Sequence, residues 1–240
     1  MKRWKLLGIA CSLFVLAGCA SLDSNIEVDN DFSGKWESQL QIPEPMSKVE
    51  LESALQDSLQ KEAKGSVPVG KLDDKETKEK IQKDQQALKE FADKHIKLEA
   101  VDPTGKEIND KDGTVRSGNW KITAKFDDDK ELTKTYRIIY DALGSTPAEN
   151  VIFPYGDESN EYMFYMGKSF GTTKITVDGD IKKEFETDGV VKDDTITFVK
   201  DKEIRFVFTT ASHFFRNTII AIIVIGGAIG GFIVWKRRGV

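Results

Sequence analysis

Cysteine and histidine are scarce in this chain of 240 residues, which contains only two of each. Cys11 lies within an apolar run near the N-terminus, so removal of that run would leave Cys19 as a single thiol without a disulfide partner. His95 and His213 stand far apart in the sequence, which argues against a serine–histidine–aspartate arrangement and against a histidine-rich metal site. We therefore expect neither an enzyme nor a resident cofactor.

A glycine-rich phosphate loop is also lacking, and the segment 108–113 matches a calcium loop only in part. Its first position is Ile108, and its twelfth is Asn119 instead of the usual Glu. A polar turn is the better interpretation, and Asp127-Asp128-Asp129 and Asp193-Asp194 are interpreted as turn residues in the same way. The sequence predicts no metal site.

Basic residues are concentrated at the two ends of the chain, in 2–5 and in 236–238. Without these six charges, 29 Lys and Arg stand against 40 Asp and Glu, a net charge of about −11. A domain of this charge repels the phosphate backbone of nucleic acids. We therefore expect no nucleic-acid partner.

The N-terminus reads as a signal peptide, residues 1–18, with a basic start and an apolar stretch too short to span about 30 Å of hydrocarbon. It ends in Leu16-Ala17-Gly18-Cys19, which resembles a bacterial lipobox. The resemblance implies cleavage between Gly18 and Cys19 and acylation of the Cys19 thiol, with palmitate as a marker. The alternative is an ordinary secretory signal followed by a chance cysteine.

The C-terminus reads as a transmembrane helix, because residues 218–235 carry no charge and just suffice to span the bilayer core. The basic tail 236–240 belongs on the cytoplasmic side, and 211–217 forms a juxtamembrane segment outside. Both anchors place the remaining chain on the extracytoplasmic side of the cell membrane. A host with one membrane, as in Gram-positive bacteria, accommodates both anchors most simply.

Four glycines in this span form two overlapping pairs with the spacing that lets helix backbones approach closely. The span could therefore form a self-dimer or dock against another membrane protein, although glycine is also frequent in membrane helices in general. The four residues are Gly226, Gly227, Gly230 and Gly231.

The extracytoplasmic part divides into an acidic linker, residues 19–32, and a β domain, residues 33–210, with a helical insertion at 46–95. The linker has no periodicity. Residues 33–42 alternate with period two and predict a strand, which Pro43 and Pro45 should end.

Two helices are predicted in the insertion. The first begins at a capping box, Ser47 to Glu50, and continues with a leucine stripe at Leu51, Leu55 and Leu59. The second covers about 73–94 and has a narrow apolar face formed by Ile81, Leu88 and Phe91. Its charged faces are interpreted as solvated surface.

From His95 onward the pattern predicts strands alone, and Asp178-Gly179 predicts a hairpin turn between two of them. The fold class is therefore mainly β with an α insertion: an antiparallel meander closed as a barrel or half-barrel, with a helical hairpin after the first strand. The predicted strands are 96–101, 115–126, 132–142, 162–166, 174–177, 181–187, 195–199 and 204–208.

Gly34 and Trp36 open the first predicted strand, and Arg205 lies on the last. This arrangement resembles the lipocalin-like (calycin) superfamily over residues 32–210. The resemblance implies that Arg205 packs across Trp36 and closes the barrel. The large helical insertion departs from the family plan, in which a hairpin follows the first strand.

An aromatic and methionine cluster at 155–170 is the candidate ligand or partner face. Alternation places Tyr162, Phe164 and Met166 on one side of a strand and Met163 and Tyr165 on the other. We expect one set to be core and the second to form an exposed apolar strip, which Trp120 and Tyr136 extend.

Two functions are compatible with these features. The first is a non-enzymatic interaction module for an envelope protein or complex, with the membrane as its other partner. The alternative is a lipocalin-like carrier of a small apolar or lipid ligand, which requires an enclosed apolar cavity.

Overall fold

The computed structural model describes residues 20–55, 75–110, 112–143, 145, 148–156 and 160–210. The predicted signal peptide, Cys19, the predicted span with its four glycines and the basic tail lie outside these residues. None of the helices in the described part of the chain combines the length and apolar character that crossing a bilayer requires.

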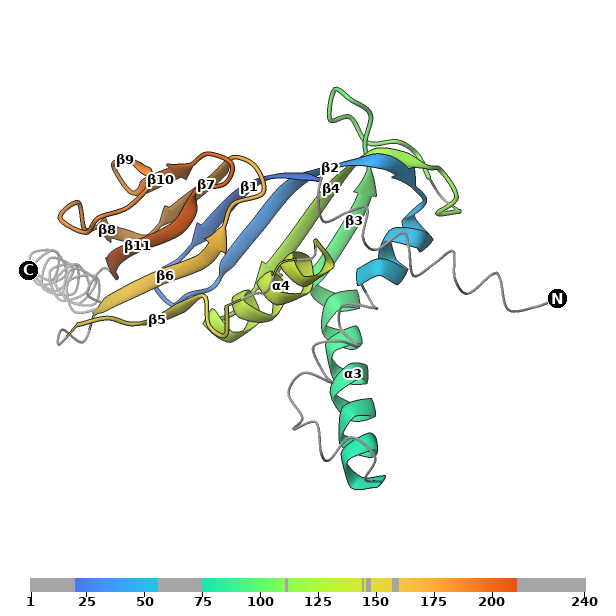
Figure 1. Ribbon diagram of the computed structural model, residues 1–240, viewed down its shortest axis with the longest axis horizontal. Helices are drawn as coiled ribbons and strands as arrows, with labels where there is room; N and C mark the ends of the chain where they lie inside the picture. Colours follow the sequence, from blue (N-terminus) through green and yellow to red (C-terminus); the bar gives the residue numbers. More distant parts are fainter. Residues whose placement is uncertain are drawn as a thin grey trace, which may run out of the picture.

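Two β-sheets and three helices make up the described fold (Figure 1). The helices are 48–55, α3 (Lys75–His95) and α4 (Asp129–Ala142). In the larger sheet the order is β3 (Ile96–Ala100), β4 (Ser117–Phe126), β2 (Gly34–Met46), β1 (Ser21–Val28), β7 (Thr173–Val177), β10 (Thr195–Phe198) and β9 (Val190–Lys192). In the smaller sheet it is β5 (Ile152–Pro154), β6 (Glu161–Lys168), β11 (Glu203–Thr210) and β8 (Gly179–Ile181).

The prediction of a mainly β fold with a helical insertion is confirmed, but the predicted barrel is wrong. The two sheets do not close on themselves, and β3 and β9 are the two edge strands of the larger sheet. The larger sheet is also not a meander, because β1 pairs with β7 in parallel and brings Ser24 opposite Thr173. Such a parallel pairing joins segments that are distant in sequence.

The predicted acidic linker, 19–32, is wrong because most of it is the central strand β1. Leu22, Ile26 and Val28 are buried in the core, and they alternate with polar residues that face outward. This period of two is present in the sequence, but the Asp, Ser and Asn residues between the apolar ones have low strand propensity.

The predicted strand at 132–142 is a helix, α4. Its threonines, tyrosines and isoleucines favour a strand intrinsically, but Leu132, Tyr136 and Ile139 recur at helical spacing and are all buried. The helix begins where the Asp128 carboxylate accepts a hydrogen bond from the Glu131 amide at 2.8 Å. Asp128 is therefore a helix N-cap and not a simple turn residue.

The predicted hairpin at Asp178-Gly179 is wrong as well. The chain passes here from β7 in the larger sheet to β8 in the smaller one, so the two strands that flank the turn do not pair. A Cβ atom at Gly179 would clash with the Thr209 carbonyl oxygen, so glycine permits the close approach of β8 to β11. The predicted strand 181–187 is mostly a loop, because β8 ends at Ile181.

The strand predicted at 33–42 is confirmed as β2, and Trp36, Ser38, Leu40 and Ile42 share its buried face. It does not end at Pro43, because β2 continues to Met46 through an irregularity in its pairing with β4. The predicted capping box is also confirmed. The Glu50 carboxylate accepts from the Ser47 amide at 2.8 Å, and the Ser47 hydroxyl accepts from the Glu50 amide at 3.3 Å.

A continuous aromatic core joins the layers. α4 covers one part of the inner face of the larger sheet, where the ring centroids of Tyr140 and Trp36 are 6.2 Å apart. The smaller sheet joins the same core through Phe206 of β11, which lies 5.1 Å from Phe164 and 6.3 Å from Phe198 of β10. The outer face of the larger sheet carries polar residues, including the Lys35–Glu27 ion pair at 3.2 Å.

Candidate functional site

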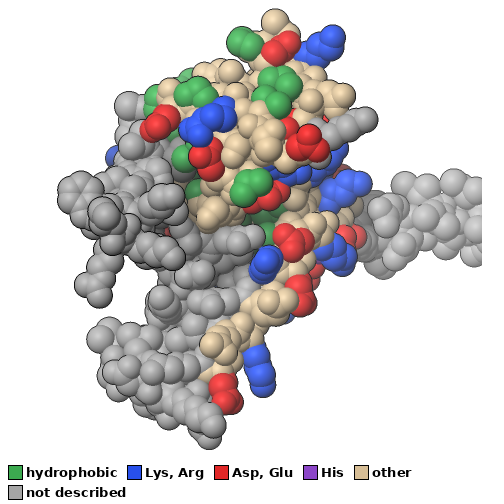
Figure 2. Space-filling view, turned by 90° about the vertical axis from the view of Figure 1, so that its right-hand side faces the viewer, with side chains coloured by type: hydrophobic (Ala, Val, Ile, Leu, Met, Phe, Trp, Pro, Cys, Tyr) green, Lys and Arg blue, Asp and Glu red, His purple; other side chains and the backbone are tan. Residues whose placement is uncertain are grey.

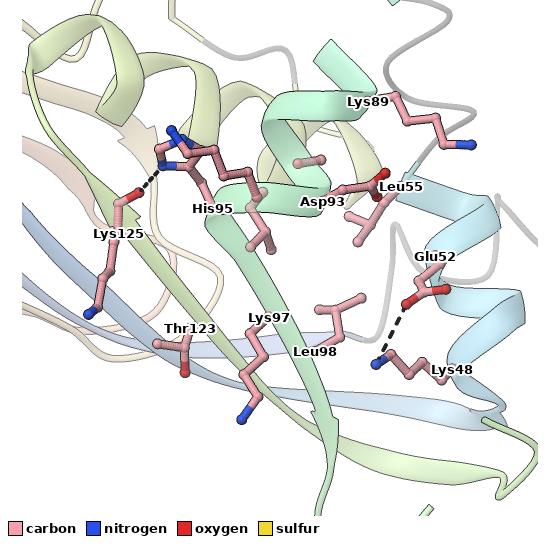
Figure 3. A pocket seen from close by; sticks show the side chains of 13 residues that line it. Lys48, Glu52, Leu55, Lys89, Asp93, His95, Lys97, Leu98, Thr123 and Lys125 are labelled. Carbon is pink, nitrogen blue, oxygen red and sulfur yellow. Dashed lines mark hydrogen bonds and ion pairs between the residues drawn. The ribbon is translucent and has the colours of Figure 1, made fainter. Parts of the chain in front are cut away.

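A cleft of about 540 Å³ lies where the helix 48–55, the C-terminal end of α3 and the edge strand β3 meet (Figure 3). Its position follows from chain connectivity, because α3 ends at His95 and β3 begins at the next residue, Ile96. The helix 48–55 is held against the sheet by Arg116, whose guanidinium contacts the Glu50 carboxylate at 2.8 Å and the Pro45 carbonyl oxygen at 2.7 Å.

Among the residues that the structure describes, lysines dominate the charge of the cleft lining, which has five lysines and two acidic side chains, Glu52 and Asp93. Two of the lysines are paired with carboxylates, Lys48 with Glu52 at 3.8 Å and Lys97 with Glu99 at 2.5 Å. The described lining still carries an excess of positive charge, in a domain that is acidic overall. Elsewhere on this face of the molecule, acidic and basic side chains are mixed, as Figure 2 shows along α3. The lysines are Lys48, Lys89, Lys94, Lys97 and Lys125.

The charge of the lysine on β3 is reinforced by a neighbouring carboxylate. The hydrogen bond to Glu99 raises the pKa of Lys97 above its ordinary value, and the negative charges of Glu99 and Glu107 act in the same direction. The Lys97 side chain is also well exposed, at 69%. Lys97 therefore presents a charged ammonium group at the sheet edge, and this group is paired with the Glu99 carboxylate of the same strand at 2.5 Å.

His95 forms one wall of the cleft and is held by contacts on several sides. Its ring stacks on Phe91 with centroids 4.5 Å apart, and its Nδ1 lies 3.1 Å from the Lys125 carbonyl oxygen. The Glu131 carboxylate is 3.7 Å from the same nitrogen, and only 8% of the His95 side chain is exposed. These contacts fix the junction between α3 and β3.

Apolar residues form the opposite side of the cleft. Leu98 is buried, and Leu55, Ala92 and Ile96 are partly buried around it. Figure 3 shows Lys97 on one side of the β3 ribbon and Leu98 on the other. Because the lining contains side chains from both faces of β3, the cleft follows the edge of that strand.

The predicted closure of a barrel by Gly34, Trp36 and Arg205 is not found. Trp36 packs against Tyr140 in the core, whereas Arg205 lies over the Phe185 ring at 5.5 Å in the smaller sheet. Gly34 has a different role. A Cβ atom at this position would clash with the Glu27 carbonyl oxygen, so glycine permits the close approach of the end of β1 to the start of β2.

The predicted aromatic face is mostly core. Phe164 and Met166 are fully buried, and Tyr162 packs edge-on against Phe32 with centroids 4.8 Å apart. The expected exposed strip is not found, because Met163 is buried and Tyr165 is half-buried. Residues 182–187 lie over that side of the smaller sheet and bond to β11 through the Val207 and Arg205 carbonyl oxygens.

The prediction that Trp120 and Tyr136 extend this exposed strip is also wrong. Trp120 is fully buried, with its indole N–H donating to the Ser117 carbonyl oxygen at 3.0 Å. Tyr136 is equally buried, and its hydroxyl donates to the Met166 carbonyl oxygen. Sequence reasoning missed the lysine-lined cleft instead, because lysine is too abundant in this chain for five residues from four elements to stand out.

The segment 108–113 is a polar turn in its described residues, as predicted. The Asp110 carboxylate accepts hydrogen bonds from the Thr114 and Val115 amides at 3.0 and 3.2 Å. Within the part of the chain that the structure describes, no group of three or more potential ligand side chains is arranged to hold a metal ion.

No protein-family model matches the chain, and a search of curated proteins gives no match. Among solved structures, the chain is similar to the NMR structure of the folded domain of the Mycobacterium tuberculosis protein LppM. The match has a TM-score of 0.41 and 9% sequence identity, and it covers 81% of this chain and 92% of that chain. At this TM-score the likeness carries no conclusion about fold or function.

Proposed function

We propose that the chain is an extracytoplasmic lipoprotein held at the cell membrane, and that its β domain is a non-enzymatic interaction module for an envelope protein or complex. The anchors are supported by the lipobox pattern ending at Cys19 and by the uncharged stretch 218–235 with its basic tail. The interaction role is supported by one observation above all, the positively charged cleft at a sheet edge of an otherwise acidic domain.

The start of β1 at Ser21 strengthens the membrane part of this proposal. A linker of the predicted length would let the domain move roughly 40 Å from an acyl group on Cys19, whereas two residues allow only about 7 Å. At the other end, the residues between Thr210 and the predicted span allow at most about 25 Å. The domain would therefore stay close to the bilayer, within reach of other envelope proteins.

The lipocalin-like carrier is less well supported. A carrier of this type requires an enclosed apolar cavity, but the two sheets do not close into a barrel. The space where the layers meet is filled by aromatic side chains, including Trp36, Tyr140 and Phe206.

Site-specific photo-crosslinking in the membranes of the native host tests the interaction role. Benzoylphenylalanine would replace Lys97 in the cleft or, as the matched control, Lys174, which is also exposed but lies on β7, four strands from β3. We expect a discrete adduct with an envelope protein from position 97 and none from position 174. Identical adducts from both positions, or none from either, would contradict the proposal.

Two further variants of the crosslinking protein test the anchors. Cys19→Ser should abolish palmitate incorporation, and unchanged lipid labelling would contradict acylation at Cys19. Replacement of 218–235 by a poly-Leu helix should keep both the membrane location and the adduct at position 97. Loss of the adduct in a protein that still fractionates with membranes would assign recognition to the glycine-containing span instead of the domain.

A further inference from the structure

We propose that the outer edge of β3 at Leu98 is the docking site for an acidic, extended segment of a partner protein, which adds to the larger sheet as one more strand. This inference rests on the proposed interaction function and specifies its site and the chemistry of the partner. The mode of recognition is β-strand addition, in which main-chain hydrogen bonds supply affinity and alternate side chains supply specificity.

The backbone of β3 has the hydrogen-bonding groups that this mode requires. The Val101 amide donates to the Asn119 carbonyl oxygen at 3.0 Å, so odd-numbered residues of this strand turn their backbone groups toward β4. The Ala100 carbonyl oxygen accepts from the Ile108 amide at 2.9 Å on the opposite side. By this alternation the Leu98 N–H and C=O face outward, and they have no partner among the residues that the structure describes.

The cleft gives an added strand room at this position. It has a volume of about 540 Å³ and is lined by residues from both faces of β3, Leu98 among them, so it borders the edge at that residue. The two sides differ in character. An added strand would place one set of side chains beside Lys97, Thr123 and Lys125 and the other set beside apolar residues.

The favoured partner sequence follows from these two sides. Glu or Asp at every second position would meet the lysines, and Val, Ile or Leu at the positions between would meet Leu98 and Leu55. In the antiparallel register that pairs Leu98 with Leu98 of a second copy, Lys97 would lie opposite Glu99 of that copy. Occupation of the edge by a second copy is therefore one of the outcomes that the tests below distinguish.

Binding of defined synthetic peptides to the purified full chain in detergent micelles tests the proposal. The first probe alternates Glu with Val. The second has the same sequence with N-methyl groups on the amides that would face β3, and the third carries Lys in place of Glu. We expect the first probe to bind and to slow hydrogen exchange at the Leu98 amide. N-methylation should weaken binding about tenfold, because backbone hydrogen bonds are lost, and the Lys probe should not bind measurably.

Charge reversal on the protein gives an independent test. Lys97→Glu should weaken binding of the Glu–Val probe about fivefold. Lys174→Glu, which changes the net charge by the same amount, should leave the affinity for this probe unchanged. Equal binding of the N-methylated probe would overturn strand addition. Equal effects of the two charge variants would overturn recognition at the cleft. Slow exchange of Leu98 in the free chain would show that residues 56–74 or a second copy already cover the edge, and would overturn the proposal as well.

The crosslinking and peptide-binding experiments together distinguish a domain that has no envelope partner from one that binds its partner in another way. An envelope adduct at position 97, combined with equal binding of the first two probes, would retain the interaction module and reject strand addition. Selective peptide binding without any adduct in native membranes would retain the docking edge and reject an envelope partner.

Discussion

Tyr136 shows how burial changes the chemistry of a single side chain in this core. Burial raises the pKa of its hydroxyl to about 12, from an ordinary value of 10.0. Only the neutral hydroxyl can donate its hydrogen bond to the Met166 carbonyl oxygen. Burial raises the pKa of Tyr140 in the same direction. Because the folded-state pKa values exceed the unfolded value, both residues favour the folded state as long as they stay protonated.

The pH dependence of stability follows from these shifts. The free energy of unfolding should keep the full contribution of Tyr136 below about pH 10 and lose it as the pH rises toward 12. The raised pKa of Tyr140 should add to the alkaline decline in the same direction. Urea denaturation between pH 8 and 12 measures the loss. Tyr136→Phe should lower stability at pH 8 by about 1 kcal/mol and flatten the alkaline decline. The exposed Tyr155→Phe should do neither, and an identical decline in both variants would contradict the assignment.

Gly34 stabilises the fold because it leaves room for the neighbouring strand β1. Gly34→Ala should lower the free energy of unfolding by about 2 kcal/mol or more, because the added methyl group would overlap the Glu27 carbonyl oxygen and the Phe126 ring. Lys35→Ala at the exposed neighbouring position should change it by less than about 1 kcal/mol. Similar stability of the two variants would show that β1 and β2 do not approach as closely as described.

At the scale of elements, the sequence was informative where a strong local signal agreed with the tertiary environment. The alternation in β2 and the capping box at Ser47 predicted the elements that form there. α4 could not be assigned by residue preference, because its β-branched and aromatic residues favour strands. It forms a helix because this conformation buries its apolar residues against the larger sheet. β1 was missed although its alternation is present in the sequence, because the Asp, Ser and Asn residues among its apolar ones have low strand propensity.

The N-cap of α4 gives a direct test of this interpretation. Asp128→Ala should lower the free energy of unfolding by about 1 kcal/mol, because the Glu131 amide would lose its acceptor at the helix N-terminus. Asp112→Ala, an exposed turn position, is the matched control. Equal urea midpoints for the two variants would mean that Asp128 is a turn residue, as the sequence alone had indicated.

At the scale of the whole molecule, the two proposed anchors leave the domain at opposite ends of β1. The strand has eight residues and is therefore about 23 Å long. Its far end lies beside the C-terminal end of β11, because the Asp178 amide bonds to the Val28 carbonyl oxygen and Gly179 pairs with Thr210. The short N-terminal tether would hold the Ser21 end nearer to the bilayer than the Thr210 end.

Quenching by spin-labelled lipid headgroups measures this orientation. A fluorophore on Gln41→Cys, opposite Ser21, should be quenched more strongly than one on Asp180→Cys, opposite Thr209. A flexible Gly-Ser insertion between Cys19 and Ala20 should reduce the difference, because the tether would then no longer be short. Stronger quenching at position 180 in the uninserted chain would contradict the orientation.

The cleft could not be predicted from the sequence, because its five lysines come from the helix 48–55, α3, β3 and β4 and converge only in the folded chain. The residues that the sequence predicted to form an aromatic face are mostly buried, and Phe164 and Met166 belong to the core.

The exchange rate of the Leu98 amide tests the central claim most directly, since this N–H group faces the outer edge of β3, away from β4. Hydrogen exchange would be followed by mass spectrometry in the full chain, once purified in detergent and once in native membranes. We predict fast exchange in the purified protein and marked slowing in the membranes, where a partner strand is present. Equally fast exchange in both preparations would contradict the account.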